Sequence, residues 1–392
     1  MNTSNPTHIA PFSFDTPGSM HMEWGGANRL GELLGEWFEQ RNLLIVTDKF
    51  LHENGLLEPA KASLAACGFN ISVFDDVIAD PPEAVLMACV EQGKTAGADI
   101  VLGLGGGSSM DIAKLVAVML KSEQPLSEVY GIGNVKGTRT PLVQVPTTAG
   151  TGSEVTNITI LTTGETTKMG VVSYQLYADR VLLDAELTIG LPSLPTAATG
   201  IDAMVHAIEA YTSVNRKNPL SDALAREALR LLSDNLITAC EDGENRAARE
   251  AMLLGSNLAG QAFSNSPVAA VHALAYPLGG HYHLPHGLTN ALMLGPVLRF
   301  NMAAAAPLYA ELADVVLGPS SDDIPIRSAR FVDHMQDLMN RSGAPQRLRN
   351  VDVTEDSLPM LARDAMKQSR LLVNNPVEVT EADALALYQE AY

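Results

Sequence analysis

The chain has 392 residues, more than a single hydrophobic core usually supports, and its 46% hydrophobic and 18% charged residues suffice to build two cores. Its net charge of −19 argues against a nucleic-acid partner, because that binding depends on lysines and arginines that neutralise phosphates.

No apolar run approaches the roughly 18 residues that a membrane span requires. The first residues lack the basic flank and apolar core of a signal peptide. The three scattered cysteines form neither a disulfide framework nor a CxxC metal site. We therefore expect a two-domain cytoplasmic protein that binds neither nucleic acid nor membrane.

Short apolar runs alternate with helical segments in the first part of the chain. The runs occupy residues 43–47, 70–74, 99–104 and 141–146, and segments such as 82–98 have helical periodicity. Such alternation is typical of parallel βαβ units, in which ligands bind at the carboxyl ends of the strands. An α/β dinucleotide-binding domain is therefore predicted.

The first run ends at Asp48. A carboxylate at the end of a strand can accept hydrogen bonds from an adenosine ribose and repel a 2′-phosphate, which favours NAD over NADP. An N-cap or turn aspartate is the alternative interpretation.

Three glycines, Gly105, Gly106 and Gly107, follow the third run, and Ser108 with Asp111 has the spacing of a capping box. Free amides at a helix N-terminus would provide a site for a pyrophosphate. A tight turn without a ligand is an equal alternative, and the GxGxxG pattern is absent.

The loop at 146–157 follows the fourth run and is rich in hydroxyls that can donate to phosphate or ribose. Further along, Lys168 is a candidate cationic contact to the cofactor, although an isolated lysine is more often solvated. The hydroxyl-bearing residues of the loop are Thr147, Thr148, Thr151, Ser153 and Thr156.

The chain becomes almost entirely helical in period after Pro192. This change predicts an α/β domain at residues 1–192 and an all-helical domain at residues 193–392. No long flexible linker separates them, so we expect close packing and a cleft between them.

A metal site is indicated in the helical half. Asp202 and His206 lie four residues apart, which places both on one face of a helix, and a carboxylate with an imidazole suits Zn²⁺ or Fe²⁺. Two more ligands would complete the shell, and the spacing alone does not choose them. The candidates are four of the chain's nine histidines, which fall within 267–294: His272, His281, His283 and His286.

Over nearly its whole length the sequence resembles the iron-containing (group III) alcohol dehydrogenases. The resemblance implies a fold like that of dehydroquinate synthase, with an α/β domain for NAD(P), a helical domain for the metal and the site in the cleft. Its motifs here are GGGSSMDIAK, PTTAGTGSEVT, DAELTIGLP, TGIDAMVHAIEAY, HALAYPLGGHYHLPHG and the tail NNPVEVTEADALALYQEAY.

The resemblance also implies roles for individual residues. The chain departs from the family where many members carry a histidine, here Tyr276, and where many carry an asparagine, here Asp80. Tyr276 or His281 is our hypothesis for a proton relay. The implied metal ligands are Asp202, His206, His272 and His286; the implied cofactor contacts are Asp48, Gly105 to Ser108, Thr147, Thr148, Thr151 and Lys168.

The activity expected from the resemblance is reversible hydride transfer between NAD(H) and a primary alcohol or aldehyde, with Fe²⁺ or Zn²⁺ as the metal, in a homodimer or a higher homo-oligomer. Three alternatives remain: a hydroxyacid–oxoacid transhydrogenase, a lyase like dehydroquinate synthase, and a non-catalytic metabolite-binding protein. The last would predict a broken ligand set, and the set is intact.

Overall fold

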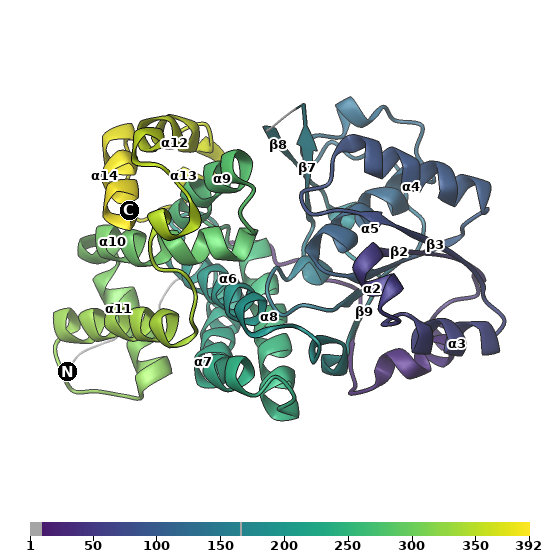
Figure 1. Ribbon diagram of the computed structural model, residues 1–392, viewed down its shortest axis with the longest axis horizontal. Coiled ribbons are helices and arrows are strands. Elements are labelled where there is room, and N and C mark those ends of the chain that lie inside the picture. The colour runs from purple at the N-terminus through teal and green to yellow at the C-terminus, as the bar shows by residue number, and fades with distance from the viewer. Residues whose placement is uncertain (1–9, 165–166) are drawn as a thin grey trace.

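The structure, a computed structural model, describes residues 10–164 and 167–392. An N-terminal α/β domain and a helical C-terminal region lie side by side, and the chain passes from the first to the second at the start of helix α6 (Figure 1). This arrangement confirms the predicted fold class. The exact division at residues 192 and 193 stays a prediction.

The α/β domain is built on one sheet of six parallel strands. All four apolar runs of the sequence form strands of this sheet. In spatial order the strands are β1 (Met20–Met22), β9 (Arg180–Leu183), β6 (Leu142–Pro146), β4 (Ile100–Gly105), β2 (Asn42–Asp48) and β3 (Asn70–Val77).

Helices cover both faces of this sheet. Along β2, Leu43 and Ile45 belong to the core beneath α1 (Leu30–Trp37) and α3 (Glu58–Ala66). The alternate residues Leu44 and Val46 belong to the larger core beneath α4 (Glu83–Thr95) and α5 (Gly107–Met119). Each fully buried Leu, Ile or Val stabilises the fold by about 1.5–3 kcal/mol, which explains why the strands are continuous apolar runs.

The strand order reverses direction between β2 and β4. From β2 the chain moves outward to β3, then crosses back over β2 to β4 on its other side. Ligands of doubly wound sheets bind at such a switch point, beyond the carboxyl ends of the strands. Asp48 and Gly105 end these two strands.

A second, three-stranded sheet projects from the first toward the helical region (Figure 1). Its strands β7 (Ile158–Thr163) and β8 (Thr167–Val172) are antiparallel, and the short β5 (Gly131–Ile132) pairs with β8. The hairpin β7–β8 carries Lys168, and the short helix α2 (Lys49–Glu53) follows β2.

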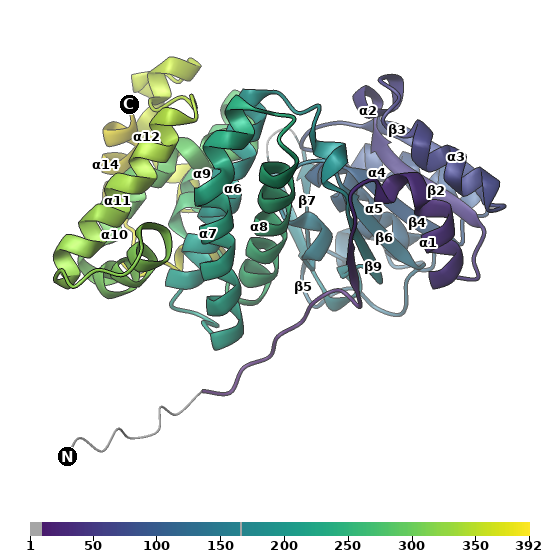
Figure 2. The same ribbon diagram turned by 90° about the horizontal axis from the view of Figure 1, so that it is seen from below.

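The helical region packs around α6, whose residues 200–212 are all buried. Helices α7, α8 and α10 pack against it, and Figure 2 shows α6, α7 and α8 side by side. The helices are α6 (Ser193–Thr212), α7 (Pro219–Glu241), α8 (Arg246–Asn265), α9 (Ala270–Tyr282), α10 (His286–Leu317), α11 (Ile324–Arg341), α12 (Leu358–Ala365), α13 (Ser369–Leu372) and α14 (Glu381–Ala391).

One helix within residues 10–164 and 167–392, α10, is long and apolar enough to cross a membrane by length and composition alone. Its most apolar window is 56% buried inside the structure, as expected for a core helix.

Two glycines of the loop at 146–157 bring the α/β domain against the helices. A Cβ at Gly150 would lie 2.7 Å from the Cβ of Thr199 on α6, and a Cβ at Gly152 would lie 2.6 Å from the Cα of Gly260 on α8. Gly152 also has a left-handed backbone, φ 60°. Only glycine permits both this conformation and this approach, so the loop sits directly on α8 and on α6, the helix that carries Asp202 and His206.

Candidate metal and cofactor site

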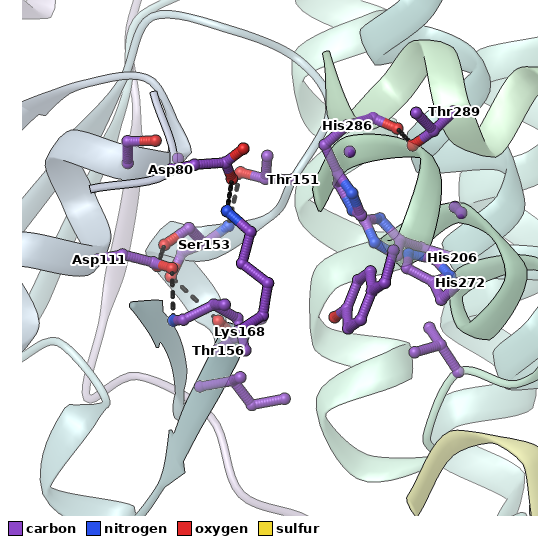
Figure 3. A pocket seen from close by; sticks show the side chains of 18 of the residues that line it. Asp80, Asp111, Thr151, Ser153, Thr156, Lys168, His206, His272, His286 and Thr289 are labelled. Carbon is purple, nitrogen blue, oxygen red and sulfur yellow. Dashed lines mark hydrogen bonds and ion pairs between the residues drawn. The ribbon is translucent and has the colours of Figure 1, made fainter. Parts of the chain in front are cut away.

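A cavity lies between the α/β domain and the helical region, and Figure 3 shows its two walls. Polar groups from α5, from the loop at 146–157 and from the hairpin face imidazoles from the helices. The labelled residues of the first wall are Asp80, Asp111, Thr151, Ser153, Thr156 and Lys168, and those of the second are His206, His272, His286 and Thr289.

Asp202, His206, His272 and His286 converge beside this cavity. Asp202 and His206 are one turn apart on α6, His272 lies in the first turn of α9, and His286 is the first residue of α10. One potential ligand atom from each lies within 4.8 Å of all the others. The Oδ1 atom of Asp202 is 3.9 Å from Nε2 of His206, 3.9 Å from Nε2 of His272 and 3.8 Å from Nε2 of His286.

This geometry fits a divalent metal ion. Ligand atoms about 2.1 Å from a tetrahedral metal lie about 3.4 Å from one another, so the three separations of 3.8–3.9 Å from Asp202 Oδ1 are about 0.5 Å longer than in a closed shell. Three imidazole nitrogens and one carboxylate suit Fe²⁺ and Zn²⁺ and do not match the all-oxygen shells of Ca²⁺ and Mg²⁺.

The protonation states also fit. Burial lowers the pKa of His206 to about 3, so its imidazole stays neutral and can donate a lone pair. Burial opposes the charge of Asp202, but the three imidazoles and a hydrogen bond from Asn290 outweigh it and hold the pKa of the carboxyl below its usual value. The side chain of His286 is 40% exposed while those of Asp202, His206 and His272 are buried, so the cluster opens toward the cavity on the His286 side.

A buried glutamate orients His272. The Oε2 atom of Glu209 is 2.6 Å from Nδ1 of His272, and Oε1 accepts the Val271 amide at 2.6 Å. A carboxylate at Nδ1 keeps the proton there and leaves the Nε2 lone pair free for a metal. Sequence reasoning missed Glu209, although its position three residues after His206 places it on the same face of α6.

Two more side chains hold the cluster. Phe263 stacks on His206 with ring centroids 4.2 Å apart and an interplanar angle of 21°. Asn290, one turn after His286, donates to Asp202 Oδ1 at 2.5 Å, and its own Oδ1 is buried without a hydrogen-bond partner among the residues described. Sequence reasoning missed both residues, and only the i, i+4 spacing of Asn290 from His286 gave a signal.

The glycine turn lies at the start of α5. The amide of Thr147 donates to Gly105 O at 3.0 Å, and a Cβ at Gly107 would lie 2.8 Å from Cγ2 of Thr151. Gly106 is the N-cap, without a side-chain cap, so the first amides of the helix remain available to an anion. The cavity is lined by Gly107, Ser108 and Thr151. The Cγ2 atom of Thr148 lies 3.9 Å from the position that a Cβ on Gly106 would occupy, and Thr147 is buried.

The expected capping box of Ser108 and Asp111 is wrong. The helix begins at Gly107, so Ser108 already lies inside it, and Asp111 turns to the neighbouring loop. There the carboxylate accepts from Ser153 Oγ at 2.6 Å and from Lys114 Nζ at 3.2 Å.

Lys114 links α5 to the hydroxyl-rich loop and to β7 through hydrogen bonds of its ammonium group. It is fully buried, and Nζ also donates to Ser153 Oγ at 2.8 Å, to Thr156 Oγ1 at 3.0 Å and to the Ile158 carbonyl at 2.7 Å. Such complete pairing is what a buried ammonium needs. Sequence reasoning missed this lysine, because its partners other than Asp111 lie about 40 residues away in sequence.

Two other predicted cofactor contacts have protein partners. Asp48 caps α2 by accepting the Leu51 amide at 3.0 Å, which is the alternative interpretation from the sequence, and still lies at the end of β2. Lys168 lines the cavity, where Nζ is 2.7 Å from Asp80 Oδ1 and 3.0 Å from Thr162 Oγ1.

The residues suggested for a proton relay are separated. Tyr276 lines the cavity, its ring centroid 5.9 Å from that of His286. Burial raises the pKa of the Tyr276 phenol, and the nearby charge of Arg370 opposes the rise. His281 instead pairs with Asp364 at 2.6 Å near the end of α9, and His283 caps that helix with a left-handed backbone. Neither His281 nor His283 lines the cavity.

Comparison with known proteins agrees with this geometry. Residues 17–185 match the family described as iron-containing alcohol dehydrogenase, and residues 196–392 match the C-terminal part of the Fe-containing alcohol dehydrogenase family. The long-chain-alcohol dehydrogenase 1 of Geobacillus thermodenitrificans is 38% identical over 383 residues, which cover 96% of this chain and 95% of that protein.

Solved structures agree over the whole fold. A 1,3-propanediol oxidoreductase has a TM-score of 0.93 at 33% identity, covering 98% of this chain and 100% of that one. The sulfoacetaldehyde reductase of Bifidobacterium kashiwanohense, solved in complex with NAD⁺, has a TM-score of 0.86 at 28% identity, covering 97% and 99%. With both halves matched and its metal-ligand cluster intact, the chain belongs to the iron-containing alcohol dehydrogenase family.

Proposed function

We propose that the protein is a metal-dependent oxidoreductase that transfers a hydride between NAD(H) and a primary alcohol or aldehyde. The observation that carries the proposal is the cluster of Asp202, His206, His272 and His286, which opens into a cavity whose opposite wall contains the glycine turn. In the direction of reduction, an aldehyde, NADH and one proton give the alcohol and NAD⁺. The relatives named for alcohol and aldehyde conversion support this assignment.

Asp202, His206, His272 and His286 would hold Fe²⁺ or Zn²⁺. When bound, the ion supplies a Lewis acid that polarises the aldehyde carbonyl or makes the alcohol more acidic. Glu209 fixes the tautomer of His272, and Phe263 and Asn290 fix the positions of His206 and Asp202. The open side at His286 is where a substrate oxygen can approach.

The opposite wall would hold NAD(H), with preference over NADP(H). When bound, the cofactor supplies or accepts the hydride at its nicotinamide ring. The amides of Gly107 and Ser108 would face the pyrophosphate, and Asp48, whose Oδ1 caps α2, would accept from the ribose through its other carboxylate oxygen. The NAD⁺ bound to the sulfoacetaldehyde reductase supports this choice.

Water must leave the space between the two walls during transfer, and the apolar lining favours this. Phe263, Val268, Ala275 and Leu284 surround the imidazoles. The proton required for reduction would come through Tyr276, whose side chain lines the same cavity. Replacing Tyr276 by Phe should lower turnover and change its pH profile, whereas His281→Ala, outside the cavity, serves as the comparison.

We also propose a homodimer of cytoplasmic location. Strand β1 is a short edge strand with Met20 43% and Met22 41% exposed, and an unpaired edge of this kind is suited to pairing with a second copy. Sedimentation analysis would give twice the mass of one chain if the protein is a dimer, and the mass of one chain if this proposal is wrong.

The test of the activity is oxidation of NADH, and separately of NADPH, by anaerobic protein loaded with Fe²⁺ or Zn²⁺, against short, branched, aromatic and acid-bearing aldehydes. Steady loss of NADH with one class of aldehyde, faster than loss of NADPH, is the expected result. Absence of turnover with every aldehyde, while metal stays bound, would contradict the proposal. Turnover between an alcohol and an aldehyde without added NAD would point to a transhydrogenase instead.

A further inference from the structure

The charged side chains that line the cavity are paired, with one exception. Asp80 pairs with Lys168 at 2.7 Å, and Asp111 pairs with the buried Lys114 at 3.2 Å. Arg370 also lines the cavity, and among residues 10–164 and 167–392 no carboxylate lies within ion-pair distance of its guanidinium. Within the part of the chain that the structure describes, the cavity therefore contains one cation without a carboxylate partner.

Arg370 lies on the helical wall and reaches across to the hairpin. It is part of α13, and its Nη2 atom is 3.9 Å from the position that a Cβ on Gly170 of β8 would occupy. It is also close enough to the Tyr276 phenol for its charge to affect that group. Arg370, an exposed residue, thus lies at the rim of the cavity beside the hairpin.

One aromatic side chain separates this guanidinium from the metal-ligand cluster. The Tyr276 phenol lies near enough to Arg370 for the guanidinium to influence it, and the ring centroid is 5.9 Å from that of His286. A small molecule whose carbonyl lies at the open side of His286 can therefore extend past Tyr276 to Arg370. The glycine turn, the proposed pyrophosphate site, belongs to α5 of the α/β domain, whereas Arg370 belongs to α13 of the helical region, so this cation is available to the substrate.

On the basis of the proposed function, we infer that the substrate is a short aldehyde or alcohol that carries an anionic group, a carboxylate, sulfonate or phosphonate, and that Arg370 binds this group. A guanidinium presents paired N–H donors that match the oxygens of such groups in a bidentate arrangement. Because the bound substrate excludes water from the cavity, these charge-assisted hydrogen bonds strengthen when the site fills.

The experiment compares pairs of aldehydes in the metal-loaded protein. Glyoxylate, succinic semialdehyde, sulfoacetaldehyde and phosphonoacetaldehyde are each assayed beside a neutral aldehyde of the same chain length. The measured quantity is the ratio of kcat/KM for the anionic aldehyde to kcat/KM for the neutral one. We expect at least one anionic aldehyde to be favoured, with a preference that falls as salt is added.

Three variants assign the preference. Arg370→Met keeps the length of the side chain without its charge and should lower the ratio by about 10- to 100-fold, as expected for loss of a hydrogen bond to a charged group. Arg370→Lys keeps the charge without the paired N–H donors of the guanidinium and should restore part of the ratio. Arg363→Met on α12 is the matched control, because Arg363 is exposed, lies outside the cavity and has no ion pair among the described residues.

A wild-type ratio near one for every pair would overturn the inference. So would an Arg370→Met variant in which the ratio is unchanged, or in which the main effect is a higher KM for NADH, which would assign Arg370 to the cofactor. If the wild-type protein reduces no aldehyde of either kind, the proposed function itself fails. That outcome is distinct from reduction of both kinds without preference.

Discussion

Replacing Glu209 by Gln tests how the protein prepares His272 for a metal. In the native structure the two carboxylate oxygens accept from Val271 N and from His272 Nδ1, each at 2.6 Å, and the side chain is 5% exposed. A glutamine has one oxygen and one NH₂ group. If the oxygen faces Val271, the NH₂ group faces Nδ1 and drives the imidazole proton to Nε2, where a metal must bind. If the amide flips, two N–H donors face each other at Val271.

The first arrangement places the proton on the nitrogen that must bind the metal, and the second leaves the buried Val271 amide unsatisfied, which costs about 1–3 kcal/mol. Loss of such a partner of a metal-bound histidine typically weakens metal binding by about 10- to 100-fold, or roughly 1.4–2.7 kcal/mol. The assay is competition of the protein with a chelator for Zn²⁺ under anaerobic conditions. The control is Glu227→Gln on the exposed surface of α7. A metal affinity of Glu209→Gln within twofold of wild type would refute the reasoning.

Three further predictions concern stability. Gly152→Ala should lower the free energy of unfolding by about 2 kcal/mol or more, because it combines a left-handed backbone with a clash against α8. The control Gly55→Ala, with φ 76° and open space around it, should lower it by only about 1 kcal/mol. Equal losses in a denaturant titration would contradict the packing argument. Lys114→Met leaves the partly buried carboxylate of Asp111 without its cation, which should lower the free energy of unfolding by up to about 3–5 kcal/mol and raise the KM for NADH. Unchanged stability and KM would show that this lysine does not hold the cofactor loop. In metal-free protein the folded His206 has a pKa of about 3 and the unfolded one an ordinary value near 6.5, so the unfolded state binds more protons between these values. Stability should therefore fall as pH drops through this window, and less steeply in His206→Gln; an identical slope in the variant would reject this explanation.

The sequence was sufficient to predict the sheet and the helical region. The run at 43–47 is apolar on both faces, as a strand covered by helices on both sides must be. Asp48 and Gly105, the last residues of two strands, could also be predicted as site candidates, because the carboxyl ends of the strands of a parallel sheet share one edge.

The metal-ligand cluster was partly accessible to reasoning from spacing. Asp202 and His206 follow from one helical turn, but the choice of His272 and His286 over His281 and His283 depended on family resemblance, because it requires knowing how α9 and α10 pack. Spacing does not encode the packing angle of two helices.

Groups that act across long sequence separations were missed. Lys114 contacts residues 153–158, and Arg370 approaches Tyr276 and Gly170 from the C-terminal part of the chain. The capping box was wrong for a related reason: Asp111 satisfies its carboxylate with Ser153 and Lys114, and this tertiary network overrides the local preference.

The central claim is that hydride transfer depends on a metal held by Asp202 and the three histidines. The most direct measurement is a titration of metal-free protein with Fe²⁺ under anaerobic conditions, following NADH oxidation in the presence of an aldehyde that the wild-type protein reduces. The account predicts that activity rises linearly to about one ion per chain, as expected for a single site, and that Asp202→Asn, which removes the one anionic ligand, shows little activity at any metal concentration. Turnover that is independent of added metal, or that survives undiminished in Asp202→Asn, would contradict it.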